Sequence, residues 1–90
     1  MSSKTLHVRI ISPFQTFLDA EAQSVSSKNT EGSFDILADH ANFLTMIENS
    51  PITVRFKNEK AQTFNFPLAI ILTSSNKVNI YIYSEPKLEK

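Results

Sequence analysis

The side chains that could catalyse a reaction lie scattered along the chain. Two carboxyl groups held close together can act as general acid and base, as they do in glycoside hydrolysis. The carboxylates to consider for such a pair are Glu21, Glu31, Asp35 and Asp39. Nothing in their spacing brings two of them together, and exposed carboxylates at strand ends are ordinary surface residues. We therefore interpret them as part of a solvated exterior.

Other patterns typical of enzymes are missing as well. Ser33, Asp39 and His40 supply the residue types of a nucleophilic triad, but a triad is defined by spatial roles rather than by sequence order. The nucleophile-elbow pattern around a serine is absent. Gly32 is the single glycine, and a phosphate-binding loop needs several glycines for close approach of the backbone. We expect no catalytic residue, no cofactor and no small-molecule substrate.

The two histidines do not predict a metal site. The chain has no cysteine, so disulfides and thiolate ligands are excluded, and no acidic cluster accompanies either histidine. We expect His7 on the polar face of a strand, as an ordinary surface residue. His40 lies in the apolar segment 38–44. We expect its ring to be partly buried and bonded by loop backbone, and the alternative is a role in an interface.

Composition excludes further classes of function. Nine basic residues balance nine acidic ones among 90, which gives no electrostatic footprint for nucleic acid or an anionic membrane. The chain is 41 % hydrophobic with seven Phe, enough to fill the core of one domain. No basic stripe accompanies the aromatic residues, so we interpret the following as core packing rather than a stacking platform: Phe43, Phe56, Phe64 and Phe66. No apolar run approaches the roughly 20 residues of a membrane-spanning helix, and residues 1–5 do not begin a signal peptide. We expect a soluble, intracellular protein that a partner could still attach to a membrane.

Alternation of apolar and polar residues predicts an all-β domain. The alternating runs are residues 6–10, 52–57, 63–66 and 78–83, and residues 58–60 and 74–77 have the composition of hairpin turns. Residues 69–72 are uniformly apolar, which predicts a strand covered on both faces. Residues 39–47 could form one helical turn with Asp39 as N-cap. The whole chain, 1–90, is expected to be one domain with an ordered core at about 5–84 and loose ends at 1–4 and 85–90.

Tyr81 and Tyr83 differ from the other aromatic residues. They share the strand face opposite Val78, Ile80 and Ile82, and in a two-layer sandwich that face points outward. Two large amphipathic rings on an outward face indicate either a contact surface or cross-strand pairs that lie flat on the sheet.

The most specific pattern of the chain is residues 30–45, T-E-G-S-F-D-I-L-A-D-H-A-N-F-L-T. With this block, the segment Leu6–Ile47 resembles the opening of the epsilon subunit of F-type ATP synthases, whose form of the block is T-E-G-E-F-G-I-L-P-G-H-x-P-L-L-T. The matching positions are Thr30, Glu31, Gly32, Phe34, Ile36, Leu37, His40, Leu44 and Thr45. Residues 75–80 resemble the last strand of the family's sandwich, so the resemblance covers residues 5–84.

The departures from the family fall mainly on glycines. Asp35 stands at the second glycine of the block, and Asp39 at the glycine before the histidine. The later Pro-Gly is Asn49-Ser50, and the Ser-Gly-Gly turn is Pro67-Leu68-Ala69. Each loss removes backbone freedom, so the resemblance predicts loops of a different shape at these places.

The resemblance implies a two-sheet sandwich of about ten short strands and a non-catalytic rotor part. In the family, this domain joins the gamma subunit to the ring of c subunits, on the cytoplasmic side of the membrane or the matrix or stromal side of an organelle. Gly32 and Ser33 would then face the c-ring, and Asp39 and His40 would lie towards gamma or the ring. The helical hairpin that inhibits the enzyme or binds ATP in family members would be missing after Lys90. A free-standing binding module, no longer part of a rotor, is the alternative.

Overall fold

The computed structural model describes residues 4–83 and contains seven strands and no helix in that range. Their order in one hydrogen-bonded sheet is β2-β1-β7-β6-β5-β3-β4, with β1 and β7 parallel and the other neighbours antiparallel. The all-β prediction is confirmed. The strands are β1 (Leu6–Ile11), β2 (Thr16–Ala22), β3 (Ser24–Asn29), β4 (Gly32–Leu37), β5 (Phe43–Arg55), β6 (Gln62–Ser74) and β7 (Lys77–Ile82).

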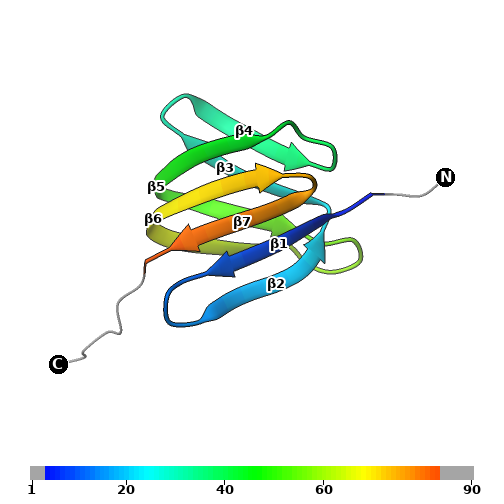
Figure 1. Cartoon of the computed structure of the whole chain (residues 1–90), viewed down its shortest axis with the longest axis horizontal. Coiled ribbons are helices and arrows are strands. Elements are labelled where there is room, and N and C mark those ends of the chain that lie inside the picture. Colours follow the sequence, from blue (N-terminus) through cyan, green and yellow to red (C-terminus); the bar gives the residue numbers. More distant parts are fainter. Residues whose placement is uncertain (1–3, 84–90) are drawn as a thin grey trace.

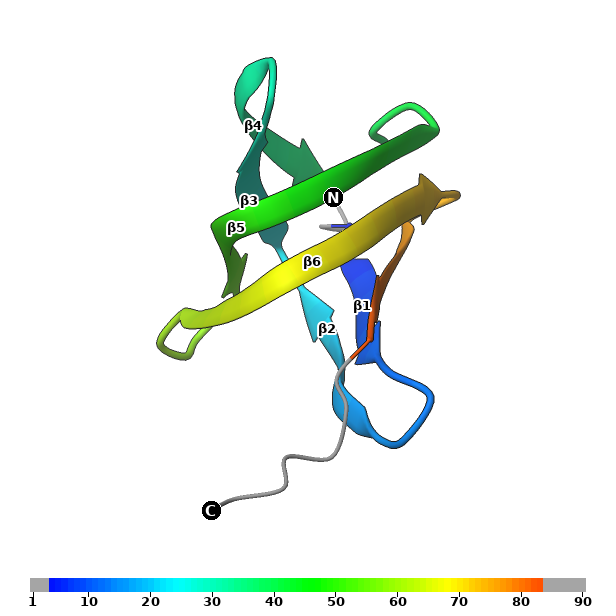
Figure 2. The same cartoon turned by 90° about the vertical axis from the view of Figure 1, so that its left-hand side faces the viewer.

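The sheet becomes a sandwich because its two longest strands fold over. β5 and β6 pair from Phe43↔Thr73 to Val54↔Gln62, and the ladder is interrupted only at Asn49 and Pro67. Pro67 has no N–H to donate, and Asn49 has a positive φ of 51°. The two strands bend there together and pass from one layer to the other (Figures 1 and 2). The first layer holds β2, β1, β7 and residues 68–74 and 43–48, while the second holds β4, β3 and residues 50–55 and 62–66.

The bend also changes which residues point inward. In β5 the odd-numbered Ile47 is buried before the bend, whereas the even-numbered Ile52 and Val54 are buried after it. β6 changes in the same way, from partly buried Phe66 to buried Ala69 and Ile71, with two exposed residues between them. Side chains alternate strictly along a regular strand, so two adjacent exposed residues mark the point of the change.

The core lies between the two layers and is aliphatic. From the first layer, β1 and β7 contribute three residues each. From the second layer, β3, β4 and β5 contribute the residues that pack against them. Phe rings close the periphery, for example in the edge-to-face pairs Phe17–Phe66 and Phe34–Phe43. The buried hydrophobic residues are Leu6, Val8, Ile10, Ala22, Val25, Ile36, Ile47, Ile52, Val54, Ala69, Ile71, Val78, Ile80 and Ile82.

Three details of the sequence-based expectation are wrong. The structure has seven strands rather than about ten, because β5 and β6 each run through both layers as one strand. Residues 39–47 form no helical turn: Ala38 and Asp39 make a turn, and β5 begins at Phe43. Residues 69–72 are not covered on both faces, since Ile70 is 39 % exposed and Leu72 is 38 % exposed. The hairpin connections predicted at residues 58–60 and 74–77 are confirmed.

One buried polar group in the core has no partner. Thr73 on β6 is fully buried, and its hydroxyl makes no hydrogen bond among the described residues. Thr45 on β5 also points inward, but its hydroxyl accepts a hydrogen bond from Asn29 Nδ2 at 2.9 Å. The two residues therefore form a matched pair, one hydroxyl without a partner and one with a partner.

We expect Thr73→Val to raise the free energy of unfolding by about 1 kcal/mol, because it removes a desolvated hydroxyl without loss of a bond. Thr45→Val should lower the free energy of unfolding by a similar amount, because it leaves the Asn29 amide unpaired. Denaturant titration of the three proteins measures both changes. A loss of stability in Thr73→Val would show that the hydroxyl is satisfied, for instance by a buried water.

Candidate functional site

An exposed hydrophobic surface covers one half of the outer side of the first layer. We call it the apolar face, and its six residues are Leu44, Met46, Leu68, Ile70, Leu72 and Tyr81. They form cross-strand neighbours, because Leu44 pairs with Leu72, and Ile70 lies between Met46 and Tyr81. Directly opposite side chains in a sheet lie about 5 Å apart, so the surface is continuous. Leu44 is 67 % exposed and Met46 is 53 % exposed.

Such a surface indicates a contact with another molecule. Single exposed apolar residues are ordinary, but contiguous apolar patches on soluble monomers are uncommon and mark interaction sites. Sequence reasoning selected Tyr81 but missed the other five residues. The signal was present in the uniformly apolar run 69–72, which we interpreted as doubly buried. A strand that is apolar on both faces needs a covering layer on each side, and the second cover is not part of the described chain.

A pair of aromatic rings lies near one end of the apolar face. The ring centroids of Phe14 and Tyr83 are 6.0 Å apart, and both side chains are exposed. The turn that carries Phe14 is held by Ser12, whose Oγ accepts hydrogen bonds from the backbone N–H groups of Phe14 and Gln15. The outward position expected for Tyr81 and Tyr83 is confirmed, at 41 % and 63 % exposure.

The loop after β4 holds Asp39 and His40 at one end of the sandwich. Asp39 has a φ of 67°, and its N–H donates to Asn76 Oδ1 at 2.6 Å in the turn between β6 and β7. Its carboxylate accepts from Lys4 Nζ at 3.1 Å. The hydrogen bond from Lys4, and next that from Asn76, lowers the pKa of Asp39. Asp39 is therefore a structural residue that ties three segments together.

His40 is fixed more loosely beside Asp39. Its N–H donates to Leu37 O at 3.1 Å, and its ring packs against Phe43 with a centroid distance of 5.5 Å. Nδ1 lies 2.8 Å from the carbonyl oxygen of Ala41, so this nitrogen carries the proton and donates. The expected partial burial of the ring is confirmed, and of its two nitrogens Nδ1 bonds loop backbone as expected. Nε2 is the ring atom that a partner could bind.

Gly32 and Ser33 begin β4 at the other end of the sandwich. Asn29 shapes the turn, because its Oδ1 accepts from Glu31 N at 2.8 Å, and its Nδ2 bonds Thr45 on β5. Gly32 has a φ of 124°, a conformation that residues with a Cβ rarely adopt. The partner-contact candidates chosen from the sequence therefore do not form one site; they are Gly32, Ser33, Asp39, His40, Tyr81 and Tyr83. The β3–β4 turn lies at the left of Figure 1, and the loop after β4 lies at the right.

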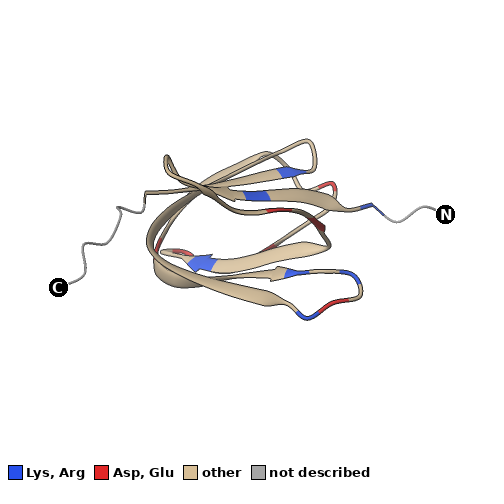
Figure 3. Cartoon of the chain, turned by 90° about the horizontal axis from the view of Figure 1, so that it is seen from below, with Lys and Arg blue, Asp and Glu red and all other residues tan. Residues whose placement is uncertain are grey.

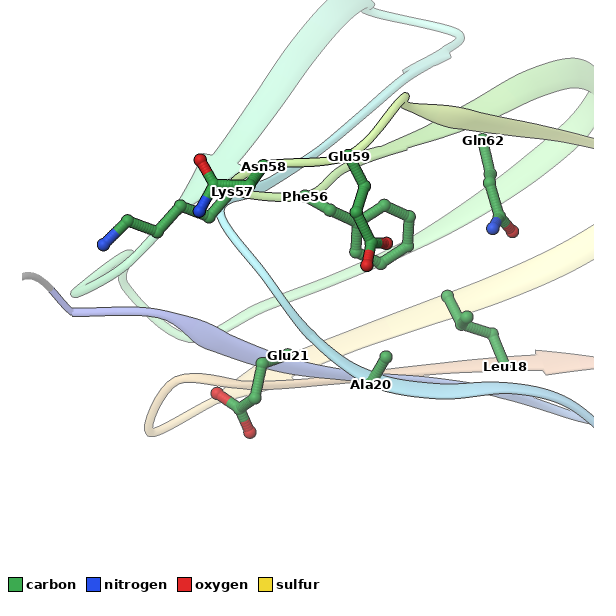
Figure 4. Close-up of a pocket in the computed structure, with 8 residues that line it drawn as sticks. All are labelled: Leu18, Ala20, Glu21, Phe56, Lys57, Asn58, Glu59 and Gln62. Atoms are coloured by element: carbon green, nitrogen blue, oxygen red, sulfur yellow. The ribbon is translucent and has the colours of Figure 1, made fainter.

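The described residues contain no arrangement that suggests catalysis. A shallow hollow of about 390 Å³ between β2 and the β5–β6 loop is lined by Leu18, Ala20, Glu21, Phe56, Lys57, Asn58, Glu59 and Gln62. Its charged groups do not converge, since Glu21 and Lys57 point away from the Phe56 ring (Figure 4).

No three His, Asp or Glu side chains of residues 4–83 are placed to hold a metal ion. Charges of both signs are spread over strands and loops without a band of one sign (Figure 3). Residues 4–83 also include no helix that could cross a membrane.

Comparison with known proteins identifies the fold. Residues 5–84 match the family model of the ATP synthase delta/epsilon chain, β-sandwich domain. The chain belongs to this family. The epsilon-type β-sandwich predicted from residues 30–45 is thereby confirmed.

Individual epsilon chains agree with this assignment. The ATP synthase epsilon chain of Nostoc punctiforme is 32 % identical over 87 residues, which are 96 % of this chain and 64 % of that one. The epsilon chain of Trichodesmium erythraeum is 42 % identical over 55 residues, 61 % of this chain and 40 % of the relative. The epsilon-type domain described here thus spans less than two thirds of the length of these relatives.

A solved structure shows the same fold. A chain in the cryo-EM structure of the central stalk and c-ring of Tetrahymena thermophila mitochondrial ATP synthase superposes with a TM-score of 0.75 at 16 % identity. The match covers 93 % of this chain and 67 % of the Tetrahymena chain. The same fold therefore occurs in that chain at 16 % identity.

We expect Gly32→Ala to lower the free energy of unfolding by about 1–2 kcal/mol. The space around the Gly32 Cα is open, so the cost arises from the backbone conformation and not from a clash. Ser33→Ala is the matched control and should change the free energy by less than about 0.5 kcal/mol, because Ser33 is exposed. Denaturant midpoints measure both. An unchanged midpoint for Gly32→Ala would mean that the turn readily adopts another conformation.

Proposed function

We propose that this chain is a non-catalytic subunit of the central stalk of an F-type ATP synthase, where it couples the gamma subunit to the c-ring. Family membership and the likeness to a chain of a central stalk and c-ring assembly support the proposal. The apolar face is the observation that carries it, because a sheet apolar on both sides requires a protein partner to cover it. The site is thus a docking surface, and it performs no reaction.

The two ends of the sandwich suit a connector. β4 begins at Gly32 in one end loop and leads to Asp39 and His40 at the other, so contacts at the two ends can engage different partners. We assign Gly32 and Ser33 to the c-ring side, and Asp39 and His40 to the gamma subunit or the ring. Tyr81 lies within the apolar face, and Tyr83 stands beside Phe14 at its end. The apolar face itself is assigned to gamma.

A rotor coupling must transmit torque without shearing. The β5–β6 ladder keeps one register on both sides of the bend and so links both layers, and relative movement of the layers would break hydrogen bonds between these two strands. On this proposal the protein is held at the membrane through its partners, on the cytoplasmic side or the matrix or stromal side of an organelle. It would need no segment of its own in the bilayer.

We expect Ile70→Lys to weaken binding of the gamma subunit at least tenfold, because binding would bury an unpaired ammonium group. Asn65→Lys is the matched control, an exposed position of the same strand β6 on the other layer, and should bind as the natural chain does. Titration of purified gamma measures the dissociation constants, with thermal melting to show that each variant is folded. Equal binding by Ile70→Lys and Asn65→Lys would show that the apolar face is not part of the interface with gamma. If the natural chain does not bind gamma, the rotor function itself is wrong and a free-standing module is favoured.

We expect His40→Ala to weaken assembly with gamma while it leaves the isolated fold intact, because the ring is partly exposed and Nε2 points to no described partner. Pull-down of gamma by the variant, together with its melting temperature, tests this. Undiminished binding would exclude His40 from the contact.

A further inference from the structure

His7 is held between two carboxylates of the neighbouring strand. Its Nδ1 lies 2.8 Å from Glu21 Oε2, and its Nε2 lies 2.6 Å from Asp19 Oδ1. Glu21 is the register partner of His7 across the β1–β2 ladder, and Asp19 is the next outward residue along β2. All three side chains lie on the outer side of the first layer, in the half that the apolar face does not cover. Sequence reasoning treated His7 as an ordinary surface residue and did not foresee this arrangement.

Both contacts can be hydrogen bonds in only one protonation state. A neutral imidazole has one N–H, so it can donate to one carboxylate while the lone pair of its other nitrogen faces the second carboxylate. The imidazolium has two N–H groups and can donate to both, as charge-assisted bonds. We propose that His7 is a proton-operated clamp that joins the edge strand β2 to β1 when its ring is protonated and releases one of the two contacts when it is not.

The surrounding charges mostly favour the closed clamp. Thr5 Oγ1 donates to Glu21 Oε1 at 2.5 Å, and Arg9 Nε lies 3.6 Å from Asp19 Oδ2, so both carboxylates are held in place. On the other side of β1, Lys77 of β7 is the register partner of His7, and its positive charge opposes protonation of the His7 ring. The hydrogen bond with Glu21, and next that with Asp19, raises the pKa of His7. The bonds from Thr5 and then His7 lower the pKa of Glu21.

These directions define the pH range in which the clamp is closed. The raised pKa of His7 means that its contribution is complete below the ordinary histidine value of about 6.5 and is lost as the pH rises through the folded-state pKa. The lowered pKa of Glu21 means that its contribution is present above the ordinary glutamate value and is lost as the pH falls through the folded-state pKa. The clamp therefore opens on the alkaline side, as the pH rises through the raised pKa of His7.

Opening of the clamp affects the structure only locally, because β2 is an edge strand. In the described sheet β2 pairs with β1 alone, so its hydrogen bonds are supported from one side. The turn between β1 and β2 carries Phe14, next to Tyr83. Opening of the clamp would loosen this edge and its aromatic pair while the aliphatic core stays closed. The expected size is small, since all the groups are exposed to solvent.

Amide hydrogen exchange, followed by NMR, tests the clamp in the whole chain. Protection factors of β2 relative to those of β7 are compared at about pH 6 and about pH 8.5 for the natural chain, His7→Gln, Asp19→Asn/Glu21→Gln and the control His40→Gln. We expect relative β2 protection to fall about two- to fivefold with rising pH in the natural chain and in His40→Gln, the size of an exposed charge pair, and to stay constant in the other two.

The titration of the His7 ring in the natural chain gives an independent check, because it does not depend on how a variant folds. Its pKa should lie above that of His7 in the Asp19→Asn/Glu21→Gln variant. A pKa for His7 at or below its value in that variant, or an equal fall of β2 protection in the natural chain and His7→Gln, overturns the proposal. Neither readout involves the gamma subunit, so the result is separate from that for the rotor function.

Discussion

The structure depends on the place where the β5–β6 ladder folds over. Pro67 cannot donate to a ladder, and Asn49 adopts a left-handed conformation, so both strands lose regular pairing at the same point. The register is the same on both sides of the break, and the two halves of each strand therefore remain partners. One folded ribbon thus replaces two separate sheets, and it fixes the distance and orientation of the layers that enclose the core.

The apolar face follows from the same bend. After Pro67, the strand turns Ala69 and Ile71 towards the core and Ile70 and Leu72 away from it. Both sets are apolar, whereas the outward positions of β1 and β2 in the same layer carry His7 and acidic residues. The outer side of the first layer therefore has a polar half, on β1 and β2, and an apolar half that water solvates poorly. A partner that covers only the second half would leave the charged β1–β2 edge in water.

The sequence predicted the strands that depend on local alternation, and it did not predict the features that depend on the bend in β5 and β6. Strict alternation located β1, β7 and the second half of β5, and the block at residues 30–45 predicted the family. The long strands were not seen as continuous, because the alternation changes phase at Asn49 and Pro67 and makes each strand resemble two short ones. Residues 39–47 were considered as one helical turn, and the start of β5 within them was missed because its partners in β6 lie far away in sequence. The clamp at His7 was missed for a similar reason, since its carboxylates belong to another strand.

The loss of glycines explains how the ends of the sandwich are built. Asp39 stands at a family glycine, and we expected a changed loop, yet it adopts the positive φ that glycine would allow. Such a conformation is unfavourable for a residue with a Cβ, and Asp and Asn are among the few that tolerate it through local hydrogen bonds. Asn76, which also has a positive φ, supplies that bond to the Asp39 N–H from another turn. Each unfavourable turn is therefore stabilised by the other, so that the end loops form one connected structure and not two independent turns.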